Sequence, residues 1–189
     1  METLISLCLG LGLSAACGFR VFVPLLLMGL GVRAGMVHPA EGFEWVGSWL
    51  AIGTFAGACG LEIVGYYVPW VDHLLDTVAT PAAAIAGALV AAAGIDHMSP
   101  LLHWGVAAVA GGGLASAVQV GTVTTRAAST ATTAGFGNPI VATVENVAAT
   151  VLSVVAIVVP VVVGLLVVAM AVVLVRGRMR KSRGRIALA

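Results

Sequence analysis

Four ionisable residues of this sequence lie in stretches that are otherwise apolar enough to cross a membrane: Arg20, Glu62, Arg126 and Glu145. A charge at the centre of a bilayer costs about 2.5–3.5 kcal/mol on insertion scales, so such residues are functional candidates by default. Two arginines suit an anion, because each guanidinium can donate two parallel hydrogen bonds to a carboxylate or phosphate. We therefore expect these four residues, with Asn138, to form a buried substrate-binding site.

Three further polar residues, Asp72, His73 and Asp76, follow Glu62 in a predicted turn at residues 69–77, where they could form the mouth of that site. The expected ligand is a small anionic solute or a phosphate-bearing lipid headgroup. A structural explanation stays open, in which the glutamates pair with the arginines and lock the helices together, since unpaired membrane charges are rarely tolerated. The two hypotheses are a small transporter or channel and a non-transporting membrane scaffold or assembly protein.

The composition identifies the elements that must position these residues. The chain has 189 residues, of which 60% are hydrophobic and 9% charged, whereas soluble domains have about 25% charged residues. This balance predicts an all-α integral membrane protein with about five spans of some 20 residues each. The spans form one domain over residues 1–176 and are expected at about residues 4–31, 45–68, 78–95, 101–126 and 139–175, the last with a kink at Pro160.

Basic residues are concentrated at the end of the chain. Six of the nine Lys and Arg lie in the tail, residues 177–189, or just before it at Arg176. Excess basic charge marks the cytoplasmic side of a membrane protein, so the tail is predicted to be cytoplasmic. Five crossings then place the N-terminus outside, and the turn with Asp72 outside as well. A basic tail can also bind anionic lipid or nucleic acid, but the topological interpretation is favoured and no nucleic acid partner is expected.

An internal repeat is suggested by the glycines that follow the two arginines. Gly-x-Gly occurs at the same distance after Arg20 and after Arg126, which would fit an inverted repeat of spans 1–2 and 4–5. Chance similarity is the alternative, because the chain has 24 glycines. The threonine-rich segment 122–139 is either a discontinuous, cavity-lining segment near the midplane or a polar outer loop, and the depth of Arg126 depends on which applies.

Small residues recur at four-residue spacing and predict close helix packing, with the lipid bilayer and a second copy of the chain as partners. No nucleophile–base pair, metal-ligand spacing or cofactor fingerprint is visible, so neither an enzyme, a cofactor nor a metal is expected. The small-residue stripes are Gly10, Ser14 and Gly18; Gly53 and Gly57; and Ala107, Gly111 and Ala115.

Three segments together resemble a bacterial membrane family labelled domain of unknown function 4126. They are Gly-Phe-Arg-Val-Phe-Val-Pro at residues 18–24, Glu62 with Val-Pro-Trp-Val-Asp at residues 68–72 and Asp76, and Gly-Asn-Pro at residues 137–139 with Glu145. The resemblance covers nearly the whole chain before the basic tail. It implies a multi-span protein of the bacterial cell membrane and supplies no established activity.

Overall fold

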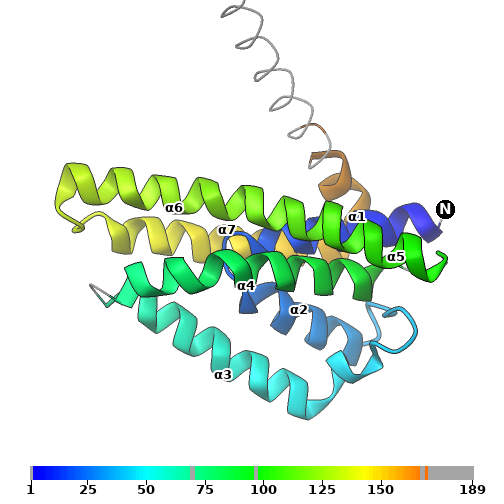
Figure 1. The fold of residues 1–189 in the computed structure, drawn as a ribbon. Coiled ribbons are helices and arrows are strands. Elements are labelled where there is room, and N and C mark those ends of the chain that lie inside the picture. The colour runs from blue at the N-terminus through cyan, green and yellow to red at the C-terminus, as the bar shows by residue number, and fades with distance from the viewer. Residues whose placement is uncertain (1, 69–70, 96–97, 167–168, 170–189) are drawn as a thin grey trace, which may run out of the picture.

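The computed structural model describes residues 2–68, 71–95, 98–166 and 169. Every regular element within these residues is a helix, which confirms the predicted all-α membrane protein (Figure 1). Two of the helical segments are not α-helical: η1 is a 3₁₀ turn and η2 has π-helical hydrogen bonding. The elements are α1 (Glu2–Cys17), α2 (Phe22–Arg33), η1 (Glu44–Gly47), α3 (Trp49–Tyr66), α4 (Val71–Gly94), α5 (Pro100–Val106), η2 (Ala107–Gly112), α6 (Gly113–Thr133) and α7 (Asn138–Val158).

Four helices are long and apolar enough to cross a bilayer: α3, residues 74–94 of α4, the continuous α5–η2–α6 rod, and α7. They correspond to the second to fifth predicted spans. The predicted interruption at Pro160 is present, because α7 ends at Val158 and the chain is helical again over residues 160–166. The predicted turn at residues 69–77 is mostly helix, since α4 already begins at Val71. Residues 177–189, the predicted tail, lie outside the described residues.

The expected first span is instead two short helices that form a re-entrant hairpin. α1 runs to the middle of the bundle, the chain reverses at residues 18–21, and α2 returns toward the end where α1 began (Figure 1). Both outer ends of the hairpin lie at the C-terminal end of α4. A Cβ on Gly94 would lie 3.1 Å from Gly10 Cα in α1, and Ala40 N after α2 donates to Ala93 O at 2.8 Å.

The hairpin changes the predicted topology. Because α1 and α2 enter and leave at one end, the start of α1 lies at the opposite end of the bundle from the last turn of α3 and the first turn of α4 (Figure 1). This separation differs from the expectation that both lie on the same side, outside the cell. The difference arose because two apolar helices, joined by a short turn whose single charged residue is Arg20, have the composition of one long span.

Small residues bring α1, α4 and η2 into close contact, as predicted. A Cβ on Gly111 would lie 2.5 Å from Ala91 Cβ and 2.6 Å from Gly87 O. Ser14 Oγ donates to Gly87 O at 2.7 Å, so its hydroxyl is satisfied inside this contact. Gly53 and Gly57 of α3 differ, because an added Cβ would meet nothing within 4 Å. A dimer, which could use that open face, stays a prediction.

Candidate functional site: a buried arginine cluster and a polar pocket

Arg20 lies at the apex of the hairpin and is fully buried. Its guanidinium reaches α7: Nη2 donates to Ala142 O at 3.1 Å, Nε donates to the Asn146 side-chain oxygen, and Nη1 lies 3.1 Å from Glu145 Oε2. The chain reverses here, so Arg20 enters the bundle interior from a non-helical segment. An arginine at a helix break inside a membrane domain is thereby provided with acceptors, as buried charge requires.

Arg126 projects from α6 and is 3% exposed. Its Nη1 donates to Asp76 Oδ1 and its Nη2 donates to Glu145 Oε2. Both sequence-based interpretations of segment 122–139 need correction, because α6 continues without a break to Thr133 and the chain then turns at residues 134–137. Arg126 is seven positions from the end of α6, or about 10 Å along the helix, so it lies in one half of the bundle rather than at its midplane.

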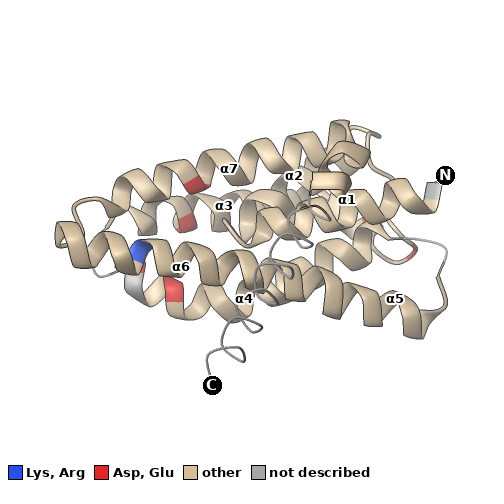
Figure 2. Ribbon diagram, turned by 90° about the horizontal axis from the view of Figure 1, so that it is seen from above, with Lys and Arg blue, Asp and Glu red and all other residues tan. Residues whose placement is uncertain are grey.

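Glu145 joins the two arginines through one carboxylate oxygen, Oε2. Both guanidinium groups also pack on the ring of Tyr66, with each Cζ atom 3.9 Å from the ring centroid. A guanidinium over an aromatic face is attracted by the ring quadrupole, more strongly when water is absent. We refer to Arg20, Tyr66, Asp76, Arg126 and Glu145 as the arginine cluster. Figure 2 shows that charged residues of the long helices gather in the same half of the bundle.

Glu62 has a different role from the one expected. It is 7% exposed, and its two carboxylate oxygens accept hydrogen bonds from Val21 N at 2.8 Å and Phe22 N at 3.0 Å. These amides open α2, where the helix dipole is positive and the first N–H groups have no partner within the helix. Glu62 therefore caps the returning arm of the hairpin from α3, and its carboxylate makes no ion pair within the described part of the chain.

A polar pocket of about 350 Å³ lies beside the arginine cluster, between α4, α6 and the start of α7. Asp76 and Arg126 belong both to the cluster and to the pocket wall. The side chain of Asp76 is 16% exposed, whereas that of Glu145 is 5% exposed, so Asp76 is the more accessible carboxylate partner of Arg126. The pocket is lined by Asp76, Thr77, Thr80, Val123, Arg126, Ala127, Thr130 and Asn138.

Asn138 opens α7 and also lines this pocket. Its side-chain nitrogen donates to Asp72 Oδ2 at 2.9 Å and to Thr130 Oγ1 at 3.1 Å. Asp72 and Asp76 both lie in the first turns of α4, and Asp76 accepts a hydrogen bond from Arg126. His73 lies on α4 between them. Of the three residues predicted to form the mouth, Asp76 lines the pocket and Asp72 is bonded to Asn138 of its wall, and all three belong to helix α4 rather than to a turn.

Tyr66 and Asn146 were missed by the sequence analysis, whereas Thr130 belongs to the threonine-rich segment that it singled out. Tyr66 precedes a predicted turn and resembles an ordinary membrane-interface aromatic. Asn146 is a polar residue in an apolar helix next to Glu145, and that position was a usable signal. Among the described residues, no group of three His, Cys, Asp or Glu side chains is arranged to hold a metal ion.

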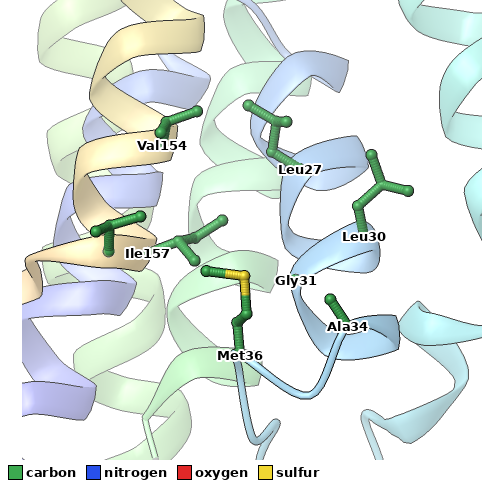
Figure 3. Close-up of a pocket in the computed structure, with 8 residues that line it drawn as sticks. Leu27, Leu30, Gly31, Ala34, Met36, Val154 and Ile157 are labelled. Carbon is green, nitrogen blue, oxygen red and sulfur yellow. The ribbon is translucent and has the colours of Figure 1, made fainter.

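A second pocket, of about 230 Å³, lies between α2 and α7 at the other end of the bundle. Figure 3 shows Leu27 and Leu30 of α2 on one side of it, Val154 and Ile157 of α7 on the other, and Met36 between the two helices. All of its lining side chains are apolar. It offers no side-chain group that could orient a charged solute, so the candidate site is the polar pocket.

The fold and the cluster define a small polytopic helical membrane protein with a re-entrant hairpin and a buried, charged site. The chain belongs to the family described as Domain of unknown function (DUF4126), which matches residues 7–180. This match confirms the family predicted from the sequence. Neither the curated proteins nor the solved structures contain a match to the chain.

Proposed function

We propose that the protein is a membrane transporter or channel that binds a small oxyanion in the polar pocket, with Arg126 as the binding residue. The observation that carries this proposal is that Arg126 belongs both to a buried ion-pair cluster and to the wall of a pocket. Its Nε is a buried donor with no acceptor among the described residues. Buried donors are rarely left unpaired, so an acceptor supplied by a ligand has a ready partner.

The re-entrant hairpin supports the same proposal. Non-helical backbone at membrane depth is tolerated where it is buried in protein or lines a cavity, and discontinuous helices are typical of substrate sites in transporters. Here the break brings Arg20 against Glu145, which also contacts Arg126. A change at the pocket can therefore reach the apex of the hairpin through one carboxylate.

A scaffold is the second candidate function. It is favoured by the fact that both arginines already contact carboxylates of the protein. Ion pairs of this kind can hold helices together without any ligand. Under this hypothesis the pocket has no solute, and the charges act only in assembly.

We further propose a bacterial cell membrane location with the N-terminus outside and the C-terminus cytoplasmic. Four crossings up to Val158 return the chain to its starting side, so this arrangement requires one more crossing. In the sequence, residues 160–175 carry no charge and the six basic residues follow them, and excess basic charge marks the cytoplasmic side of a membrane protein. The polar pocket then opens in the cytoplasmic half of the membrane.

The test is uptake by purified protein in proteoliposomes, with nitrate and radiolabelled inorganic phosphate as probes. The wild-type protein should take up at least one of them, and R126M/D76N, which removes one charge of each sign, should lose uptake while keeping its elution volume. R33M is the matched control, since Arg33 is an exposed arginine stacked on Trp49.

The same variants distinguish a free anion from a lipid headgroup. If the headgroup is the ligand, phosphatidylglycerol should be retained by the wild type in native mass spectrometry and lost from R126M/D76N, with no uptake of either free anion. If neither anion is bound or transported and the lipid is not retained, the proposed function is wrong and the scaffold remains.

A further inference from the structure

The arginine cluster is balanced in charge before any ligand enters. Its two guanidinium groups face two carboxylates, those of Glu145 and Asp76. The carboxylate of Glu62 lies nearby but is held by the backbone amides that open α2. An anion that bound Arg126 would therefore leave one negative charge in excess within a buried site. Such a charge is poorly tolerated unless it is paired or neutralised by a proton.

We infer that a proton enters with the anion and that Asp76 accepts it. This inference rests on the proposed function and specifies its coupling. On binding, a proton adds to Asp76 and converts its carboxylate to the neutral acid, and the anion takes the place of that carboxylate at Nη1 of Arg126. On release, the anion leaves, the proton leaves with it, and Asp76 again pairs with Arg126. One proton accompanies each monovalent anion, and the transported pair is neutral.

The geometry favours Asp76 over Glu145 for this role. Asp76 lines the polar pocket and contacts Arg126, so a proton and an anion can reach it from the same space. Glu145 is more deeply buried and its Oε2 contacts both arginines. Protonating Glu145 would remove the partner that the two arginines share, whereas protonating Asp76 leaves that contact in place.

Other charged or titratable groups surround Asp76 on each neighbouring element. Arg126 faces it from α6, Tyr66 from α3 beneath the Arg126 guanidinium, and Glu145 from α7 through the same guanidinium. On its own helix, Asp72 and His73 lie one turn earlier. Arg20 contributes from the apex of the hairpin through Glu145. Of Glu145 and Asp76, which both contact Arg126, Asp76 is the one that lines the polar pocket.

The test measures nitrate and proton movement together in proteoliposomes that enclose a pH-sensitive dye. Nitrate is the probe because it carries no titratable proton. With the membrane potential clamped at zero by valinomycin and potassium, nitrate entry through the wild-type protein should acidify the lumen, and an imposed potential should leave the uptake rate unchanged. D76N should abolish acidification while nitrate still enters, and its uptake should become sensitive to potential. E44Q, which changes an exposed carboxylate at the other end of the bundle, should behave as the wild type.

The wild-type measurement is decisive even if D76N does not fold. Nitrate uptake without acidification, slowed by a negative interior, would overturn proton coupling and leave the proposed function standing. Phosphate uptake by the wild type that moves no protons beyond those phosphate itself carries would overturn the coupling in the same way. If neither nitrate nor phosphate is bound or transported, this inference is wrong, and the proposed function is wrong with it unless phosphatidylglycerol is retained.

Discussion

Arg20 and Arg126 contact the same carboxylate oxygen, Glu145 Oε2, and pack on the same aromatic ring, that of Tyr66. Two like charges so close together would repel in a medium of low dielectric. The shared carboxylate and the ring face offset that repulsion, and Asp76 adds a second negative charge beside Arg126. The apex of the hairpin is thereby linked to the wall of the polar pocket, which makes the cluster the place where binding and backbone arrangement can be coupled.

Removing the ring of Tyr66 should weaken the fold by affecting both arginines at once. We expect Tyr66→Leu to lower the free energy of unfolding by about 1–3 kcal/mol, since a desolvated cation–π contact contributes about 1–2 kcal/mol. Tyr66→Phe keeps the ring and should cost less. Thermal unfolding in detergent measures the difference. Tyr67→Leu is the control, because Tyr67 is 42% exposed; equal losses for residues 66 and 67 would contradict the stacking role.

The effects of replacing Arg126 and Asp76 on the free energy of unfolding should be strongly coupled. Arg126→Met alone leaves Asp76 without its guanidinium partner and Glu145 with only Arg20, and breaking a buried pair in this way costs about 3–5 kcal/mol. Adding Asp76→Asn should recover a large part of that loss while anion binding stays absent. A double-mutant cycle of unfolding free energies gives the coupling energy. Additive losses would show that Arg126 and Asp76 do not interact.

Glu62 should stabilise the hairpin locally rather than through an ion pair. Glu62→Ala removes the acceptor of two backbone amides, and we expect a loss of about 2–3 kcal/mol, because hydrogen bonds to a charged group contribute about 1.5–3 kcal/mol. Hydrogen exchange should become faster at Val21 and Phe22, the two amides that Glu62 accepts from. Unchanged exchange at these amides would show that the cap is dispensable.

Because η2 packs closely against α4, adding a methyl group at Gly111 should lower the stability of the fold. Gly111→Ala would place a Cβ 2.5 Å from Ala91 Cβ, and overpacking of this kind costs about 1–3 kcal/mol. Gly113→Ala is the matched control in the same rod, since its Cβ would meet nothing within 4 Å. Thermal unfolding of the two variants compares them directly, and similar midpoints would contradict the close contact.

Much of the site could be predicted from the sequence, because charges in apolar segments are conspicuous. Arg20, Arg126 and Glu145 were expected to be buried, and the structure brings them into contact. Asp76 was assigned to a mouth, and its place in the cluster depends on α4 starting earlier than expected. The pairing of Glu62 could not be foreseen, since sequence shows a buried carboxylate but not which donors the fold presents to it.

The hairpin could not be predicted for a physical reason. Residues 18–21 carry no turn signal stronger than Gly18, and both α1 and α2 are apolar. A hydropathy average over this segment therefore predicts one continuous span. Pro24 falls inside the expected first span, but it stands in the first turn of α2, and proline is favoured near helix starts. Whether this segment forms one long helix or two half-length helices depends on tertiary contacts. Here these are the contacts of Arg20 with α7 and of Glu62 with the start of α2.

Cysteine labelling should reveal the hairpin directly. In a background with the buried Cys8, Cys17 and Cys59 replaced by alanine, Leu4→Cys in the first turn of α1 and Met36→Cys after α2 should react with a membrane-impermeant maleimide from one side. Phe136→Cys, in the α6–α7 turn, should react from the other side. All three side chains are more than half exposed, at 59%, 57% and 88%.

The same three positions separate the two topologies. A single first span would place residues 4 and 36 on opposite sides, so labelling of both from one side excludes it, and labelling from opposite sides would contradict the hairpin. For the proposed orientation, positions 4 and 36 should react in intact spheroplasts, and position 136 only after the membrane is opened. The reverse pattern would keep the hairpin and place the polar pocket in the outer half of the membrane, so that the proposed anion would enter the site from outside the cell.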